Sequence, residues 1–142
     1  MIRYTLDTSV LLRWFAQSND VDTDRALSIR QEQLAEKIEL TVLDQSVYEL
    51  AHVLKESQAF DQHRLDNALA SLEYMHLDIV PYNPEITRKA SQIAFEHSIS
   101  IYAAGVVALG AQLRCQAITS DRDLYRKISN LPWTVLLSTM NF

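Results

Sequence analysis

The chain has 142 residues, of which 18 are acidic and 13 are basic, so its formal net charge at pH 7 is −5. This charge excludes a protein that holds nucleic acid by bulk electrostatics, but not an enzyme whose carboxylates gather in a cleft. The hydrophobic content of 48% excludes wholesale disorder, and the single cysteine, Cys115, excludes an internal disulfide and a cysteine-based metal site. No apolar run approaches the roughly 20 residues of a membrane span, and residues 1–4 do not begin a signal peptide. We therefore expect a cytoplasmic protein that does not enter membranes.

Short β-rich runs alternate with stretches of helical period along the chain, and no repeat or linker interrupts them. The runs predict five strands, at residues 2–6, 40–43, 78–82, 116–120 and 134–137. The periodic stretches predict helices at residues 9–16, 22–36, 85–97, 101–113 and 121–127, and two more that begin near Asp44 and Asp61. This alternation is typical of an α/β domain. We expect one domain over residues 1–142, a three-layer α/β/α sandwich with a central, mostly parallel five-stranded sheet.

Acidic residues stand where two of the predicted strands end. Asp7 follows the strand at residues 2–6, Asp121 follows the strand at residues 116–120, and Asp123 lies two positions further on. The carboxyl ends of parallel strands share one edge of a sheet, where open α/β folds bind ligands. Like charges about 4 Å apart repel by roughly 4 kcal/mol at an effective dielectric constant of 20, so such a cluster favours a cation. Oxygen ligands favour Mg²⁺ or Mn²⁺; the alternative is that these aspartates only cap the helices that follow them.

Four segments resemble the motifs of one protein family, in the family's order. They are residues 6–12 (LDTSVLL), 47–51 (VYELA), 98–102 (SISIY) and 117–123 (AITSDRD). Each motif is weak alone, but four in order on a matching α/β pattern form a specific signal. The chain resembles PIN-domain ribonucleases, especially the VapC-type toxins of bacterial toxin–antitoxin pairs, from residue 2 to about residue 137.

The resemblance implies a metal-dependent endoribonuclease that cuts RNA with Mg²⁺ or Mn²⁺ in its cleft. Matched residue by residue, Asp7, Glu49 and Asp121 fall on the acidic positions of the family, with Asp123 as an accessory ligand. Helical periodicity alone places Glu49 on the solvent side of its helix, so its metal role rests on the resemblance. The family also implies a homodimer and a cognate antitoxin protein whose tail enters the cleft.

The sequence also suggests roles for several polar and aromatic residues. Ser9 and Thr119 are expected to orient the carboxylates by hydrogen bonds, with bonds to local backbone as the alternative. Trp14 and Phe15, with Tyr48, form either a core seam or an exposed groove, and we favour the core. The four histidines lack the spacing of metal ligands.

One position departs from the family pattern. The residue after Tyr102 would be an aspartate in these ribonucleases, but this chain reads Tyr102-Ala103-Ala104. The third acidic ligand is missing, through natural divergence or through a deliberate substitution, and we expect the chain as written to be inactive or impaired. The alternative function is a catalytically degenerate PIN-fold module that binds RNA or protein. A metal-dependent α/β phosphatase is disfavoured, because the residues from 7 to 9 lack the second aspartate of an aspartyl-phosphate mechanism.

Overall fold

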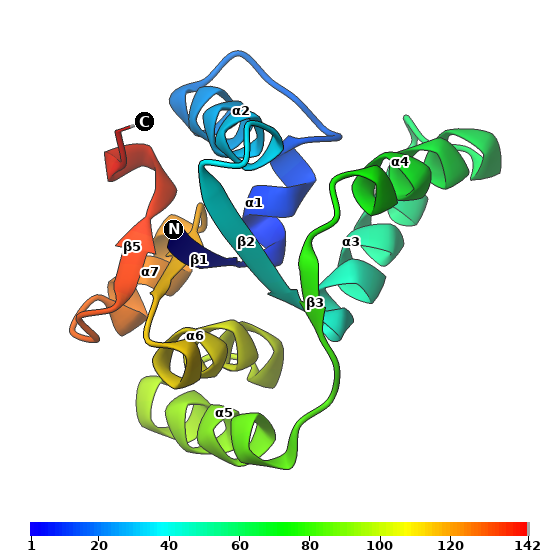
Figure 1. The fold of residues 1–142 in the computed structure, drawn as a ribbon. Coiled ribbons are helices and arrows are strands. Elements are labelled where there is room, and N and C mark those ends of the chain that lie inside the picture. The colour runs from blue at the N-terminus through cyan, green and yellow to red at the C-terminus, as the bar shows by residue number, and fades with distance from the viewer. Residues whose placement is uncertain (142) are drawn as a thin grey trace.

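A five-stranded parallel sheet forms the centre of the molecule in the computed structural model, which describes residues 1–141 (Figure 1). The strands are hydrogen-bonded in the order β3-β2-β1-β4-β5, and each neighbouring pair is parallel. They are β1 (Ile2–Leu6), β2 (Ile38–Leu43), β3 (Asp78–Val80), β4 (Gln116–Thr119) and β5 (Thr134–Leu136). This arrangement confirms the predicted α/β fold class.

The carboxyl ends of β1 and β4 lie side by side at the middle of the sheet. Leu6 is in register with Ile118, and the backbone N–H of Asp7 donates to the carbonyl oxygen of Ile118 over 2.9 Å. β2 and β3 extend the sheet on one side of β1, whereas β4 and β5 extend it on the other. The sheet order therefore reverses between β1 and β4, which is where open α/β sheets form their ligand-binding crevices.

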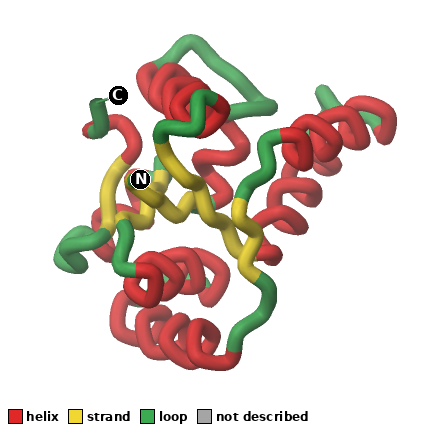
Figure 2. The backbone as a smooth tube through the Cα atoms, in the orientation of Figure 1, coloured by secondary structure: helices red, strands yellow, loops and turns green. Residues whose placement is uncertain are grey.

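Helices cover both faces of the sheet (Figures 1 and 2). One apolar core joins the sheet to α1 (Thr8–Arg13), α2 (Val21–Leu34), α3 (Asp44–Glu56) and α4 (Gln62–Tyr74). The second core contains α5 (Pro84–His97), α6 (Ile101–Leu113) and α7 (Arg122–Ile128). A short 3-10 helix, η1 (Leu137–Thr139), follows β5 and packs against α2.

The sequence of α6 explains why this helix can lie so deep in the second core. Its residues are apolar almost all round, and the run from Ala104 to Gly110 is buried. Gly110 permits a close approach to backbone, because a Cβ atom there would lie 3.1 Å from the Cys115 carbonyl oxygen and 3.1 Å from the Trp133 ring. α6 thus packs against β4 and the segment before β5 through backbone as well as side chains.

Some expected boundaries were wrong by a few residues. α1 ends at Arg13 rather than at residue 16, and β2 begins at Ile38 rather than at residue 40. β3 ends at Val80 because Pro81, with no N–H, cannot continue the ladder. Asp44 is the first residue of α3 rather than the residue before it. Asp61 caps α4 as expected, since its carboxylate accepts from the backbone N–H of Arg64.

The aromatic residues near the N-terminus divide between core and surface. Trp14 is 3% exposed and its indole N–H donates to the carbonyl oxygen of Ala26, and Phe15 packs against the same core. Tyr48 is 79% exposed, so the expected core seam does not include it. Among the described residues no single helix is long and apolar enough to span a membrane. α5 and α6 reach that length and apolar content only when taken together, and their axes are bent by 117°.

Candidate active site

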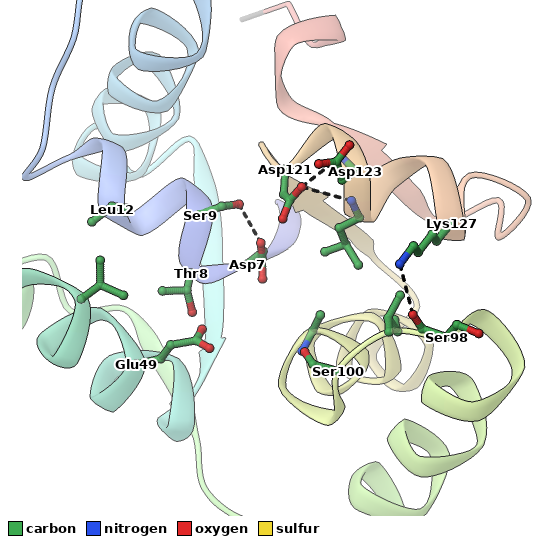
Figure 3. Close-up of a pocket in the computed structure, with 14 residues that line it drawn as sticks. Asp7, Thr8, Ser9, Leu12, Glu49, Ser98, Ser100, Asp121, Asp123 and Lys127 are labelled. Carbon is green, nitrogen blue, oxygen red and sulfur yellow. Dashed lines mark hydrogen bonds between the residues drawn. The ribbon is translucent and has the colours of Figure 1, made fainter.

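An open cleft of about 490 Å³ lies at the carboxyl ends of β1 and β4 (Figure 3). Residues of α1, α3, α6 and α7 line its walls. The lining brings together all the acidic residues singled out from the sequence and the position where an acidic residue was expected: Asp7, Glu49, Asp121, Asp123 and Ala103. These residues come from four separate segments of the chain.

Asp7 occupies the N-cap position of α1, but its side chain makes no capping hydrogen bond. Its Oδ2 atom instead accepts from the Ser9 hydroxyl at 2.6 Å and from the Thr119 hydroxyl at 3.0 Å. Burial raises the pKa of the Asp7 carboxyl, the two hydroxyl hydrogen bonds act in the opposite direction, and the nearby Asp121 carboxylate adds to the rise. Asp7 is therefore a carboxylate held in a fixed orientation at an energetic cost.

Asp121 stands in the same sequence context but does cap its helix. Its Oδ1 atom accepts from the backbone N–H groups of Asp123 at 3.0 Å and Leu124 at 3.1 Å. Its own N–H donates to the Thr119 hydroxyl at 3.1 Å. The capping bonds fix the carboxylate at the start of α7, on the cleft side.

Ser9 connects the two strand ends through a second set of hydrogen bonds. Its hydroxyl accepts from the N–H of Ser120 at 3.0 Å, and its carbonyl oxygen accepts from the Ser120 hydroxyl at 3.1 Å. The Ser9 and Thr119 hydroxyl oxygens lie 3.2 Å apart. The loop after β1 and the loop after β4 are therefore tied to each other and to Asp7.

Glu49 and Asp123 enter the cleft from opposite sides and differ in exposure. Glu49 is half-buried against the cleft, whereas His52 and Glu56, which share its side of α3 by periodicity, are exposed. The Asp123 side chain is 82% exposed and forms an ion pair with Arg126. Glu49 is consequently better placed than Asp123 to act inside the cleft.

Ala103 is the third residue of α6, and its N–H donates to the hydroxyl of Ser100, the cap of this helix, at 3.1 Å. It lines the cleft at the position where the resemblance predicts a carboxylate. Lys127 lines the same cleft, and its ammonium donates to the Ser98 carbonyl oxygen at 3.4 Å. Lys127 follows Leu124 by three positions, so the two side chains share one face of α7.

A match to a protein-family model over most of the chain decides the family. The family model of the PIN domain matches residues 4–129. The chain belongs to the PIN-domain family. Among curated proteins, no sequence matches this PIN domain.

Solved structures with the same fold include proteins from toxin–antitoxin complexes. A toxin–antitoxin complex from Klebsiella pneumoniae contains a chain with 15% identity and a TM-score of 0.71, covering 94% of this PIN domain and 97% of that chain. VapBC2 from Rickettsia felis, bound to a DNA fragment from its promoter, gives 14% identity and a TM-score of 0.70, with 95% and 97% covered. PAE2754 from Pyrobaculum aerophilum gives 20% identity and a TM-score of 0.62, with 97% and 91% covered. The fold is thus that of VapC-like PIN domains.

The oxygen donors of this PIN domain suit a hard divalent cation. The cleft lining offers carboxylates and hydroxyls, and its described residues include neither histidine nor cysteine. Within residues 1–141, no three His, Cys, Asp or Glu side chains are grouped closely enough to enclose a metal ion. A divalent cation that binds through one or two carboxylates and keeps several waters, as Mg²⁺ does, would suit this open arrangement.

Proposed function

We propose that this PIN domain is a Mg²⁺- or Mn²⁺-dependent endoribonuclease toxin of a toxin–antitoxin pair, impaired as written by Ala103. The main support is that Asp7, Glu49 and Asp121, from three separate motifs, line one cleft. Membership of the PIN family supports nuclease activity and the use of divalent ions in general. The likeness of fold to the chains of toxin–antitoxin complexes supports the toxin assignment.

Each residue has a defined part in this proposal. Asp7 and Asp121 would hold the cation, and Glu49 would complete the site from α3, directly or through a water. The Ser9 and Thr119 hydroxyls keep Oδ2 of Asp7 engaged, so that the carboxylate cannot rotate. A bound divalent cation lowers the pKa of a coordinated water and neutralises charge that develops on the phosphate.

Asp123 and Ala103 would contribute less to holding the cation than the three carboxylates above. Asp123 would act as an accessory ligand through water, because its side chain is exposed and already paired with Arg126. Ala103 offers no oxygen, so the cation would be held from α6 by nothing but solvent. A cation that is held loosely is poorly placed for chemistry, which is why we assign impaired rather than full activity.

The decisive experiment measures cleavage of a mixed RNA by the Ala103→Asp protein, with and without the further substitution Asp7→Asn. We expect cleavage that needs Mg²⁺ or Mn²⁺, stops in chelator and is lost with Asp7→Asn. Glu39→Gln serves as the control, because Glu39 pairs with Arg3 away from the cleft and should leave cleavage unchanged. Cleavage that persists in chelator or with Asp7→Asn would contradict the proposal.

A second function is favoured by one observation, the methyl group of Ala103 in the cleft. A degenerate PIN-fold module would bind RNA or a protein without cutting it. RNA binding and cleavage assays distinguish the two functions. The binding module would bind RNA in chelator, and Ala103→Asp would not make it cleave RNA. A short upstream reading frame that encodes a DNA-binding antitoxin would favour the toxin.

The proposed toxin also has protein partners, a cognate antitoxin and a second copy of itself. One of its structural neighbours belongs to a toxin–antitoxin complex from Klebsiella pneumoniae, which supports the first. Large exposed apolar side chains support the second: Tyr82 is 73% exposed, Tyr102 is 60% exposed and Ile101 is 45% exposed. Tyr82 and Ile101 line one groove beside the start of α6.

A further inference from the structure

Asp22, in the first turn of α2, is a buried charged residue that the cleft chemistry does not use. Its side chain is only 3% exposed. Its Oδ2 atom accepts from the Arg122 guanidinium at 3.0 Å and lies 3.5 Å from the guanidinium of Arg13. Its Oδ1 atom is buried and has no hydrogen-bond partner among the described residues. A carboxylate removed from water in this way needs its cationic partners to remain in place.

The two arginines belong to the two helices that begin at the cleft aspartates. Arg13 is the last residue of α1, whose N-cap is Asp7. Arg122 is the first residue of α7, whose N-cap is Asp121. The carboxylate of Asp22 therefore contacts both short helices, one at its far end and one directly beside the cleft.

A second ion pair restrains the same corner of the molecule. Arg13 also donates to Oδ2 of Asp20 at 2.7 Å, and Asp20 caps α2 by accepting from the N–H of Thr23. The start of α2 is thus fixed by its own cap while it holds Arg13 and Arg122. The Arg122 side chain is 56% exposed, so its ion pair adds little to stability, but the charged hydrogen bonds at Asp22 are directional and define one geometry.

We propose that Asp22 is a positioning residue for the cleft, which fixes α1 relative to α7 and thereby Asp7 relative to Asp121. For its effect on metal binding, this inference rests on the proposed function. The side chain of Asp22 does not line the cleft, so its influence passes through Arg13 and Arg122. Replacing Asp22 should loosen the start of α7 and change the position of the Asp121 carboxylate relative to that of Asp7.

The test uses the whole protein with Asp22→Asn, which keeps the shape of the side chain but removes its charge. The matched control is Glu39→Gln, which removes one carboxylate charge from the Arg3–Glu39 pair at the amino end of the sheet. The first measurement is amide hydrogen exchange of Asp123 and Leu124, whose N–H groups cap on Asp121. The second is paramagnetic broadening of the amide signals of Asp7 and Asp121 by added Mn²⁺.

We expect Asp22→Asn to remain folded, to exchange the Asp123 and Leu124 amides faster, and to need about 10- to 100-fold more Mn²⁺ for equal broadening, as is usual when residues behind metal ligands are removed. Glu39→Gln should change neither measurement. A folded Asp22→Asn with unchanged exchange and unchanged Mn²⁺ broadening would show that Asp22 serves stability alone, and would overturn the inference.

A second pair of variants covers the case in which Asp22→Asn does not fold. Arg122→Gln removes one partner while Arg13 still neutralises Asp22, and it should loosen the same amides; Arg122→Lys, which keeps the charge, should restore part of the protection. No loosening in Arg122→Gln would contradict the inference. If Mn²⁺ broadens no cleft signal in the unchanged protein, the proposed metal site fails, and amide exchange alone decides the role of Asp22.

Discussion

Restoring a carboxylate by Ala103→Asp tests the proposed chemistry most directly. The backbone N–H of Ala103 is already bonded to the Ser100 hydroxyl, so the helix start can accept the new side chain without rearrangement. An acidic group in the first turn of a helix gains about 0.3–1 kcal/mol from the helix dipole. Repulsion by one carboxylate across the cleft, at a separation of roughly 8 Å, costs about 2 kcal/mol at an effective dielectric constant of 20. Without metal, the variant should therefore be less stable by about 1–2 kcal/mol.

The gain in rate should be much larger than this loss in stability. Misplacing a reacting group by about 1 Å costs roughly 100-fold in rate, which corresponds to about 2.7 kcal/mol of activation free energy. We expect Ala103→Asp to raise Mg²⁺- or Mn²⁺-dependent RNA cleavage by about that factor or more. The added metal should also restore the stability lost to repulsion, because it neutralises the crowded carboxylates.

The assay compares the unchanged protein, Ala103→Asp and Ala103→Asn on a mixed RNA, with metal and with chelator. Ala103→Asn is the matched control, since it has the same shape but adds no charge, and it should gain little activity. Thermal unfolding with and without Mn²⁺ gives the stability change. A folded Ala103→Asp protein that binds Mn²⁺ and leaves every RNA intact would refute the ribonuclease and favour the binding module. Full activity in the unchanged protein would refute the role assigned to residue 103.

Three further predictions follow from individual contacts. The pKa of Asp7 is raised in the folded state, so the folded protein loses stability as the pH rises above about 3.8 towards that pKa. Asp7→Asn removes this ionisable group and should therefore be more stable than the unchanged protein at pH 7 in chelator. Urea titrations should show that the difference in unfolding free energy vanishes below about pH 3.8. Gly110→Ala should destabilise the fold by about 1–3 kcal/mol in thermal unfolding, because its methyl group would meet the Cys115 carbonyl and the Trp133 ring at 3.1 Å; Gly105→Ala, which meets only side-chain ends, should cost less. Light scattering should show a homodimer, and a mass that stays monomeric at all concentrations, with or without antitoxin, would contradict it.

The fold could be predicted from the sequence because its alternation of apolar runs and helical periods is strong. The apolar run before Asp7 and the all-apolar stretch at residues 101–113 became β1 and α6 within the expected bounds. The weaker signals gave the errors. Asp44 has the chemistry of a cap, but α3 starts at this residue, so its carboxylate accepts from the N–H of Gln45 instead of closing the helix end.

The site could be predicted only in part, for reasons of geometry. Asp7 and Asp121 follow adjacent strands, and position alone brings them to one sheet edge. Glu49 could not be found by periodicity, because α3 turns its apolar stripe to the core and forms the cleft wall with the flank beside it. Asp22 gave no signal, because an acidic residue in a first helical turn is ordinary, and its burial depends on Arg122, 100 positions later.

The contrast between Asp7 and Asp121 bears on how one cleft could hold two like charges and bind the cation that the proposed function requires. Asp121 is compensated within the protein, since the N–H groups at the start of α7 donate to it. Asp7 is compensated less, since hydrogen bonds from the Ser9 and Thr119 hydroxyls and the Ser9 backbone do not offset its burial, and its pKa stays raised. A cation that ligates Asp7 must displace any proton held there, so its apparent affinity should fall as pH drops towards that pKa. The incompletely compensated charge of Asp7 is therefore the feature of this cleft that a divalent ion would relieve.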